Sequence, residues 1–483
     1  MSESSPRPRR RPSQTKIVAT VGPACDEPAK LVELIEAGVD VFRVNAAHGD
    51  RQEHQGSVDR IREAGQAAGR VVAILVDLAG PKIRLGELPG GEMECPTGDE
   101  VRFVRGDVAH EPGDLTTTYE PLLDELQLGD RIMLADGTVA LAVERLDEGS
   151  ATCRIVQGGL LRSRQGVNLP GVKLSVPTLG AKDRENARWA AGAGVDFIGL
   201  SFVRSADEVR ALQSLIESEG AEAQVIAKIE KPEALEDLDE IVQTTDGVMV
   251  ARGDLGVEID IARVPVVQKE IIDACHRHRK PVIIATQMLD SMQHARLPTR
   301  AEATDVANAI LDGADACMLS GETAIGRYPR EAVEMMHRIA LATESVPRRA
   351  RPVDAPDLAA EGVNQITEAT TFAAGRLAEE LGAETIVVAS ASGQTALSLS
   401  KNRHFVPTIG VSDSQATLRR MCLYWGVIPL PGAPTNNSAA LLEHVVQRGR
   451  AAGYFAEGDR LVLVSGTGLR TTRHNMIVVH ELD

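Results

Sequence analysis

The sequence predicts an α/β fold: a (β/α)₈ TIM barrel that carries an inserted small β-barrel domain and a C-terminal α/β domain. Three observations predict it. Eight short apolar runs are each followed by a helical pattern, one connection is far too long for a barrel loop, and strands again alternate with helices after a proline- and arginine-rich stretch. A chain of 483 residues is also too long for one hydrophobic core and should form roughly two to four domains.

The eight apolar runs are the predicted barrel strands. Nearly continuous Val, Ile and Leu is typical of parallel strands that are buried on both faces. The runs are Ile17–Thr20, Val41–Asn45, Val71–Asp77, Asp196–Ser201, Val225–Glu230, Gly247–Arg252, Val282–Thr286 and Cys317–Ser320. The helical stretches between them include Pro28–Ala37, Ala206–Glu219, Pro232–Gln243, Ala262–His278, Thr299–Leu311 and Arg330–Thr343. Polar residues end the runs, which is where a barrel of this kind has its active site.

The connection after the third predicted strand indicates an inserted domain. Nearly a hundred residues separate this strand from the helix expected near Asp183. They contain short β-prone runs and the turn signals ELPGGE, TGDE, LGDRIMLADGTVAL and GVNLPG. We therefore assign residues 15–78 and 178–346 to the barrel, and residues 79–177 to a mostly β domain that stands over the barrel mouth as a lid.

A third domain follows the stretch SVPRRARPVDAPDLAAEG, whose composition is typical of a linker. From Asn364 onward, helical patterns alternate with short strand-like runs. These runs are Glu384–Ala389, Thr408–Val411, Gly426–Pro429, Arg460–Val464 and Met476–His480. We assign residues 360–483 to an α/β domain.

The composition excludes several classes of protein. A formal net charge of −17 argues against nucleic-acid binding, and no window approaches the roughly 18 unbroken apolar residues of a membrane span. Six scattered cysteines without a CxxC pair predict reduced thiols in a cytoplasmic protein. Residues 1–14 are basic and proline-rich with no apolar stretch after them, so we expect a disordered tail rather than a secretory signal.

Charged side chains converge at the predicted barrel mouth. Lys228 and Glu230 lie two apart at the end of the fifth strand, so both point the same way. The next strand ends in VMVARGDLG, where glycines flank Asp254 and allow close approach of a ligand. Glu230 and Asp254 are suited to Mg²⁺, which usually takes one or two carboxylates besides substrate oxygens. Other strands end in Arg43, Asn45, Asp77, Thr286 and Ser320.

Long motifs in a fixed order extend from about Thr15 to the C-terminus. They include TKIVATVGPA, GPKIRLG, AKIEKPEAL, DGVMVARGDLGVEI, KPVIIATQMLDSM, PTRAEATDVANAILDGADACMLSGETAIGRYPREAV and LYWGV. In these motifs the chain resembles pyruvate kinase. The resemblance implies transfer of the phosphoryl group of phosphoenolpyruvate to ADP, giving pyruvate and ATP in glycolysis. It also implies Mg²⁺, or Mn²⁺ in its place, and a cytoplasmic homotetramer.

Residue roles follow from the resemblance at the matching positions. Lys228 would stabilise the developing enolate, while Glu230 and Asp254 would hold Mg²⁺. Gly253, Asp254 and Thr286 would contact phosphoenolpyruvate, with backbone N–H groups of the ARGDLG segment receiving its carboxylate. Arg43 would hold the transferring phosphoryl group. The expected nucleotide-side residues are Asn45, His48, Arg84 and Arg164.

The chain departs from many family members around their K⁺ site. Those members read NFSH and DTKGPE, whereas this chain reads NAAH at residues 45–48 and DLAGPK at residues 77–82. Oxygen ligands are lost and an ammonium is gained. Similar DL/Q-x-GPK patterns occur in K⁺-independent members. We therefore predict that Lys82, with Asn45 and Asp77, takes the electrostatic role of K⁺, so that K⁺ is not required.

Two further positions, Gln165 and Gln394, differ from family patterns, and Gln394 stands where an arginine is common in the family's effector loop. Gln165 stands where many relatives have a lysine, with Arg164 next to it as a replacement contact for ADP. In the C-terminal domain, the loop VVASASGQTALSLS matches the family's effector loop in position, and its hydroxyl and N–H groups suit a phosphorylated effector. The candidate residues are Ser390, Ser392, Gly393, Gln394 and Thr395, with Arg470 and Arg473 from a later loop. The alternative is a capped helix start without a ligand.

Two rival interpretations remain open from the sequence. A barrel lyase of phosphoenolpyruvate or pyruvate chemistry would share the Mg²⁺–carboxylate mouth, but its turnover would not depend on ADP. A non-catalytic metabolite sensor on the same fold would bind ligand through the C-terminal domain. The presence of Lys228, Glu230, Asp254 and Thr286 together argues against the sensor.

Overall fold

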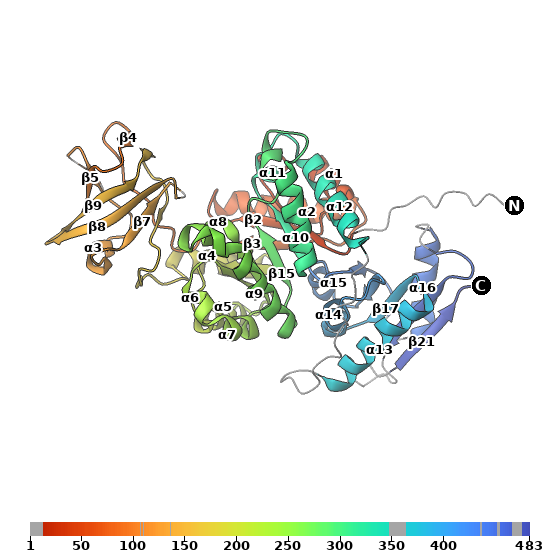
Figure 1. The fold of residues 1–483 in the computed structure, drawn as a ribbon. Coiled ribbons are helices and arrows are strands. Elements are labelled where there is room, and N and C mark those ends of the chain that lie inside the picture. The colour runs from red at the N-terminus through yellow and green to blue at the C-terminus, as the bar shows by residue number, and fades with distance from the viewer. Residues whose placement is uncertain are drawn as a thin grey trace.

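The computed structural model describes residues 13–346, 364–451, 455–465 and 476–483, apart from positions 107, 110, 136 and 435–436. The chain forms three bodies in a row, with the barrel between the inserted β domain and the C-terminal α/β domain (Figure 1). The residues 1–12 of the expected tail and the residues 347–363 of the expected linker lie outside the described ranges. No helix in those ranges is long and apolar enough to span a bilayer.

The predicted barrel is confirmed as a closed ring of eight parallel strands in the order β1-β16-β15-β14-β13-β12-β3-β2. The strands are β1 (Lys16–Thr20), β2 (Val41–Asn45), β3 (Ala73–Asp77), β12 (Phe197–Leu200), β13 (Gln224–Ile229), β14 (Gly247–Ala251), β15 (Val282–Ala285) and β16 (Ala316–Leu319). Side chains alternate between a packed interior and the layer under the helices, which is why every strand reads as an apolar run.

The main barrel helices are α1 (Pro28–Ala37), α2 (Arg51–Ala67), α4 (Ala181–Gly192), α5 (Ala206–Ser218), α7 (Leu238–Thr244), α9 (Val264–Arg277), α10 (Arg300–Asp312) and α12 (Pro329–Glu344). Short helices α6 (Glu233–Glu236), α8 (Arg252–Glu258) and α11 (Gly321–Ala324) follow strand ends. The single helix predicted for Pro232–Gln243 is divided at Asp237, whose backbone leaves the helical region. A capping box between Asp50 and Glu53 starts α2.

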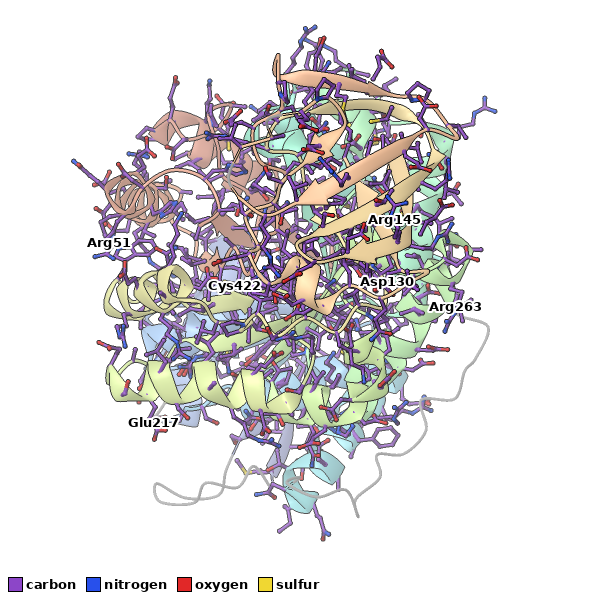
Figure 2. The ribbon with its side chains drawn as sticks, turned by 90° about the vertical axis from the view of Figure 1, so that its left-hand side faces the viewer. Arg51, Asp130, Arg145, Glu217, Arg263 and Cys422 are labelled. Atoms are coloured by element: carbon purple, nitrogen blue, oxygen red, sulfur yellow. The ribbon has the colours of Figure 1, made fainter. Side chains whose placement is uncertain are left out.

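The inserted domain is a curled, mainly antiparallel sheet in the order β11-β7-β8-β9-β5-β6, with a small β10-β4 ribbon. Its strands are β4 (Glu92–Cys95), β5 (Glu100–Val104), β6 (Asp114–Leu115), β7 (Arg131–Leu134), β8 (Val139–Asp147), β9 (Ser150–Gln157), β10 (Gly159–Arg162) and β11 (Val167–Asn168), and α3 (Leu122–Glu125) lies among them. Viewed from its own side, the sheet that carries Arg145 stands in front of the barrel (Figure 2). It has a separate hydrophobic core.

The C-terminal domain is a five-stranded sheet in the order β19-β18-β17-β20-β21, parallel except for β21. The strands are β17 (Thr385–Ala389), β18 (Thr408–Val411), β19 (Val427–Leu430), β20 (Arg460–Ser465) and β21 (Met476–Glu481). The helices are α13 (Gln365–Leu381), α14 (Gln394–Lys401), α15 (Gln415–Met421) and α16 (Ser438–Ala451). All five strands overlap the runs predicted from the sequence.

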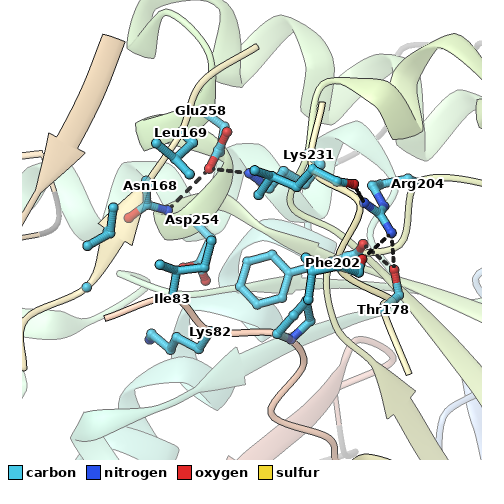
Figure 3. A pocket seen from close by; sticks show the side chains of 15 residues that line it. Lys82, Ile83, Asn168, Leu169, Thr178, Phe202, Arg204, Lys231, Asp254 and Glu258 are labelled. Atoms are coloured by element: carbon cyan, nitrogen blue, oxygen red, sulfur yellow. Dashed lines mark hydrogen bonds and ion pairs between the residues drawn. The ribbon is translucent and has the colours of Figure 1, made fainter. Parts of the chain in front are cut away.

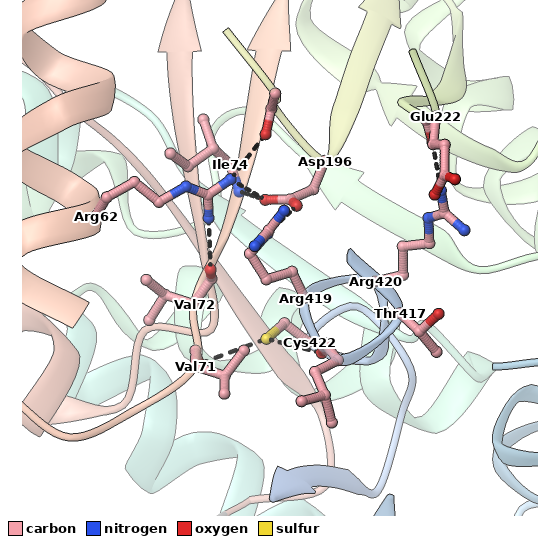
Figure 4. Close-up of polar contacts among 12 residues, drawn as sticks. Arg62, Val71, Val72, Ile74, Asp196, Glu222, Thr417, Arg419, Arg420 and Cys422 are labelled. Atoms are coloured by element: carbon pink, nitrogen blue, oxygen red, sulfur yellow. Dashed lines mark hydrogen bonds and ion pairs between the residues drawn. The ribbon is translucent and has the colours of Figure 1, made fainter. Parts of the chain in front are cut away.

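Aspartates fasten this domain to the base of the barrel. Asp196 precedes β12, accepts the backbone N–H of Ile74 at 2.8 Å, and forms ion pairs with Arg62 at 2.8 Å and Arg419 at 2.5 Å. Arg419 comes from α15, so one buried carboxylate joins strand, barrel helix and C-terminal domain (Figure 4). Asp315, before β16, repeats the arrangement: it accepts the N–H of Val282 and pairs with Lys401 and Arg403.

Candidate active site

A buried cluster of alternating charges lies at the C-terminal ends of β2, β3 and β13. The Asp77 carboxylate is fully buried, with Arg43 Nη2 2.6 Å from its Oδ2 and Lys228 Nζ 3.1 Å from its Oδ1. Lys228 Nζ is also 3.0 Å from Glu230 Oε1. The period of two along each strand turns these residues inward. Gly199 opposite Asp77 leaves the necessary room, because a Cβ there would lie 3.0 Å from Asp77 Oδ1.

The environment shifts the proton affinities of this cluster in opposite directions. Burial would lower the pKa of Lys228, but Asp77 and Glu230 outweigh it and raise the pKa to about 12. Burial would raise the pKa of Asp77, yet Lys228 and Arg43 hold it below its usual range. Burial, only partly offset by Lys228, raises the pKa of Glu230 to about 7, with Asp254 and Asp77 adding to the rise. The lysine is therefore a fixed cation, while Glu230 lies among surplus negative charge.

That surplus makes the carboxylates suitable for a divalent cation. Glu230 is 1% exposed and feels repulsion from Asp254, and Asp254 forms no ion pair with any residue that the structure describes. Within the same ranges no group of three His, Cys, Asp or Glu side chains forms a metal site. Two carboxylates with room for substrate oxygens fit Mg²⁺, which binds few protein ligands.

Thr286 and Gly253 form a second part of the site at the ends of β14 and β15. Thr286 Oγ1 accepts the N–H of Gly253 at 2.8 Å and donates to the Ala285 carbonyl at 2.7 Å. Its backbone has a φ of 68°, an unusual value for a β-branched residue. The Gly253 N–H, which the resemblance directs toward a substrate carboxylate, is thus engaged by the Thr286 hydroxyl in this structure. Arg252 pairs with Asp305 and supports the Thr286 carbonyl.

A cleft between the inserted domain and the barrel opens beside the buried charged cluster (Figure 3). Lys82, Asn168 and Phe202 line it together with Asp254 and Glu258. Glu258 Oε1 accepts Lys231 Nζ at 2.7 Å and Asn168 Nδ2 at 3.3 Å, so a barrel ion pair also contacts the inserted domain.

The expected nucleotide-side residues do not all lie together. Asn45 accepts the Ala47 N–H, and the carbonyl of the exposed His48 lies 2.6 Å from Nε2 of His54. Arg84 and Arg164 lie in the inserted domain, where Arg84 Nη1 donates to the Arg164 carbonyl at 3.0 Å. The Arg164 guanidinium is 2.6 Å from Glu87 and its side chain is 76% exposed. None of the contacts among the described residues joins these two arginines to the barrel cluster.

Lys82 is exposed on the cleft and forms no ion pair within the described ranges. The sequence predicts that Asp77 acts together with Lys82, but in the structure the Asp77 carboxylate forms ion pairs with Arg43 and Lys228. Lys82 shares the cleft with Asp254 (Figure 3).

The expected effector residues form the turn between β17 and α14. Gly393 has a φ of 87° and donates its N–H to Ser390 Oγ at 3.0 Å, while the Gln394 N–H lies 3.4 Å from Ser392 Oγ. Thr395 is buried in the first turn of the helix. The hydroxyls therefore already cap some of the N–H groups predicted to meet a phosphate. Arg470 and Arg473 lie outside the described residues.

The loop after β12 makes two contacts to the charged cluster that the sequence did not predict. Ser201 Oγ accepts Lys228 Nζ at 2.6 Å, and the Phe202 N–H donates to Glu230 Oε2 at 2.7 Å. The predicted strand ends at Ser201, and that end position is the only available signal. A phenylalanine with a positive φ whose backbone binds a carboxylate leaves no pattern in a single sequence.

Comparisons with known proteins agree with this architecture. The family model "Pyruvate kinase, barrel domain" matches residues 12–333, and "Pyruvate kinase, alpha/beta domain" matches residues 368–480. The pyruvate kinase of Geobacillus stearothermophilus is 42% identical over 97% of this chain and 80% of its own length, and that of Staphylococcus aureus is 40% identical with the same coverage. The crystal structure of a pyruvate kinase from Cryptosporidium parvum superposes with a TM-score of 0.89 at 32% identity, covering 98% of this chain and 96% of the other. The chain therefore belongs to the pyruvate kinase family.

Proposed function

We propose that this enzyme transfers the phosphoryl group of phosphoenolpyruvate to ADP at the barrel mouth, with Arg43, Lys228 and Thr286 as its catalytic residues. The observation that carries this assignment is the Lys228 ammonium, fixed between Asp77 and Glu230 beside the guanidinium of Arg43. Phosphoryl transfer asks a protein mainly for positioning and for positive charge around the transferring group. Arg43 at the end of β2 and Lys228 at the end of β13 both contact the Asp77 carboxylate and supply that charge.

The proposed role of each residue follows from its charge. Arg43 holds the transferring phosphoryl group, and Lys228 stabilises the enolate oxygen that forms when the phosphoryl group leaves. Glu230 and Asp254 would hold Mg²⁺, which supplies further positive charge to the phosphoryl and enolate oxygens when bound. Gly253, Asp254 and Thr286 contact phosphoenolpyruvate. Asn45, His48, Arg84 and Arg164 belong to the ADP side, which requires the inserted domain to approach the barrel and exclude water.

Replacing the central lysine tests the assignment. Lys228→Met should lower ADP-dependent pyruvate formation by about 10³-fold or more, since it removes a preorganised charge at the developing anion. Lys182→Met, an exposed lysine on α4, is the matched control and should keep the wild-type rate. Pyruvate formation that ignores ADP would favour the lyase, and no turnover by the wild type would favour the sensor.

The proposal extends to the monovalent cation. Lys82 is an exposed ammonium on the cleft that also holds Asp254, in a loop without the side-chain oxygens that K⁺ needs. We expect Lys82 to fulfil the electrostatic role of K⁺ once substrates bind. Lys82→Glu should then make the rate depend on added KCl, whereas Lys173→Glu, at another exposed lysine of the inserted segment, should not. A Lys82→Glu enzyme with unchanged activity in tetramethylammonium chloride would refute this role.

The C-terminal loop at Ser390–Thr395 remains a proposed site for a phosphorylated effector. Its support is the left-handed Gly393 at the start of α14, with hydroxyls gathered around it. Thermal shift with a panel of phosphorylated metabolites tests it, and no shift with any of them favours the capped helix. We also propose a cytoplasmic homotetramer, to be checked by sedimentation velocity.

A further inference from the structure

The segment after β12, residues 201–204, lies where both connections to the inserted domain meet the barrel. We call it the junction loop. Residues 78–82 lead from β3 into the inserted domain, and residues 174–178 return from it. The junction loop contacts both connections and also two residues of the charged cluster.

The outgoing connection is fastened by Ser201 and Phe202. Ser201 Oγ donates to the Leu78 carbonyl at 2.6 Å. The Phe202 ring covers Gly80 so closely that a Cβ on this glycine would lie 2.6 Å from the ring. Gly80 has a φ of 68°, so both space and backbone conformation require glycine at this point.

The return connection is fastened mainly by Arg204. Its guanidinium donates to the carbonyls of Leu174 at 2.8 Å and Val176 at 2.9 Å, and it is held in place by Glu208. Thr178 Oγ1 adds a contact to the Phe202 carbonyl at 3.4 Å. One arginine on the barrel thus binds two backbone groups of a connection that carries the whole inserted domain.

The same loop holds the charged cluster. Ser201 Oγ receives the Lys228 ammonium at 2.6 Å, and the Phe202 N–H reaches Glu230 Oε2 at 2.7 Å. Phe202 has a φ of 57°, a conformation that costs about 1 kcal/mol or more outside glycine and persists only where surrounding contacts impose it. In this conformation the Phe202 N–H donates to Glu230 of the cluster, and the Phe202 ring packs against Gly80.

We propose that the junction loop couples the orientation of the inserted domain to the positions of Lys228 and Glu230, with Phe202 and Arg204 as positioning residues. The roles of Lys228 and Glu230 rest on the function proposed above. A rotation of the inserted domain moves both connections, and the loop passes that movement to the lysine through Ser201 and to the carboxylate through Phe202. Assembly of the charged site and approach of the inserted domain then occur together.

Hydrogen exchange of the metal-free enzyme tests the coupling without using activity. Arg204→Met should speed exchange by about tenfold in residues 174–178, which lose three hydrogen bonds from the guanidinium, and also in residues 78–82 and 224–230, which Arg204 does not touch. Arg210→Met is the matched control, since Arg210 lies on α5 with exposed partners Asp207 and Glu240. Faster exchange confined to residues 174–178 would overturn the proposal.

A Mn²⁺ titration followed by electron paramagnetic resonance adds a second readout. Arg204→Met and Phe202→Leu should each raise the Mn²⁺ dissociation constant by about fivefold or more, and Arg210→Met should not. Unchanged Mn²⁺ affinity in both variants would refute the coupling, whereas a wild-type enzyme that binds no Mn²⁺ would refute the proposed metal site instead. Thr178→Val, a smaller change in the same contacts, takes the place of Arg204→Met if that variant fails to fold.

Discussion

At the scale of single residues, the site depends on backbone conformations that side chains must tolerate. Thr286 is β-branched yet has a φ of 68°, and Gln287 follows it with a φ of 54°. Such strain is maintained only where neighbouring contacts fix it. The contacts here are the hydrogen bonds of the Thr286 hydroxyl to the Gly253 N–H and the Ala285 carbonyl. The hydroxyl therefore orders two strand ends at once.

Removing that hydroxyl should harm catalysis more than folding. Thr286→Val leaves the Gly253 N–H without its acceptor, a loss of about 1–3 kcal/mol that should reduce kcat/KM for phosphoenolpyruvate by about tenfold or more. Thr286→Ser keeps the oxygen and should stay within a few-fold of wild type. Steady-state kinetics check both variants. Equal kinetics for Thr286→Val and wild type would show that the hydroxyl has no positioning role.

Residue-level prediction from sequence succeeds where strand periodicity decides the direction of a side chain. Periodicity places Lys228 and Glu230 at one strand end, and the structure brings them together with Arg43 and Asp77. Which cation pairs with which carboxylate depends on the register between the barrel strands, and a single sequence does not reveal that register. The contacts of Ser201 and Phe202 were not predicted because they depend on a loop conformation, with a positive φ at Phe202, that leaves no pattern in a single sequence.

At the scale of elements, the same hydrogen bond recurs at the aspartates that precede alternate barrel strands. Asp40, Asp196, Asp246 and Asp315 precede β2, β12, β14 and β16, and each accepts a backbone N–H from the first two residues of a neighbouring strand. The bonded N–H groups belong to Ile17, Ile74, Val225 and Val282. These hydrogen bonds fix the base of the barrel, while the charged site lies at the opposite ends of the strands.

Asp315 should be a large contributor to stability because it serves two buried cations. Lys401 and Arg403 lie 2.6 and 3.0 Å from its oxygens, with side chains 1% and 6% exposed. Asp315→Asn should lower the free energy of unfolding by about 3–5 kcal/mol, since it leaves these charges uncompensated. The exposed pair of Asp239 and Arg277 provides the control: Asp239→Asn should cost less than about 1 kcal/mol. Urea denaturation measures the free energy of unfolding of both variants. Similar losses in the two would contradict this role of Asp315.

The elements themselves were largely predictable. Eight barrel strands and five C-terminal strands overlap the predicted runs, because burial on both faces gives apolar runs that few loops imitate. Helix α2 was expected after the second strand but without bounds, since most of its side chains are polar or charged and its apolar stripe is narrow. The predicted helix at residues 232–243 was wrong in its continuity, as Asp237 interrupts it.

At the scale of the whole molecule, a histidine lies between the barrel and the C-terminal domain. His276 Nε2 is 2.9 Å from the Gly313 carbonyl and 3.2 Å from Arg403 Nη2. Burial lowers the pKa of His276, and Arg403 and Lys401 lower it further, to about 3, although Asp315 opposes them. The His276 imidazole is therefore neutral in the folded protein, where the C-terminal domain packs against the barrel.

This histidine should make stability depend on pH below neutrality. Well above pH 6.5 it contributes nothing, because it is neutral in both states. Below that value the unfolded chain gains a proton that the folded protein excludes, so stability falls as pH decreases toward 3, by about 1–2 kcal/mol at pH 5. His276→Gln should reduce the fall in melting temperature between pH 7.5 and pH 5, while His278→Gln should not. An identical fall in His276→Gln and wild type would contradict this role.

The most direct test of the central claim compares ADP-dependent pyruvate formation from phosphoenolpyruvate with Mg²⁺ in KCl and in tetramethylammonium chloride at equal ionic strength. We expect equal rates in the two salts and no pyruvate without ADP, because the proposed role of Lys82 is to supply the charge that K⁺ would otherwise provide. Activity only in KCl would contradict the role of Lys82. Absence of ADP-dependent pyruvate in either salt would contradict the catalytic assignment itself.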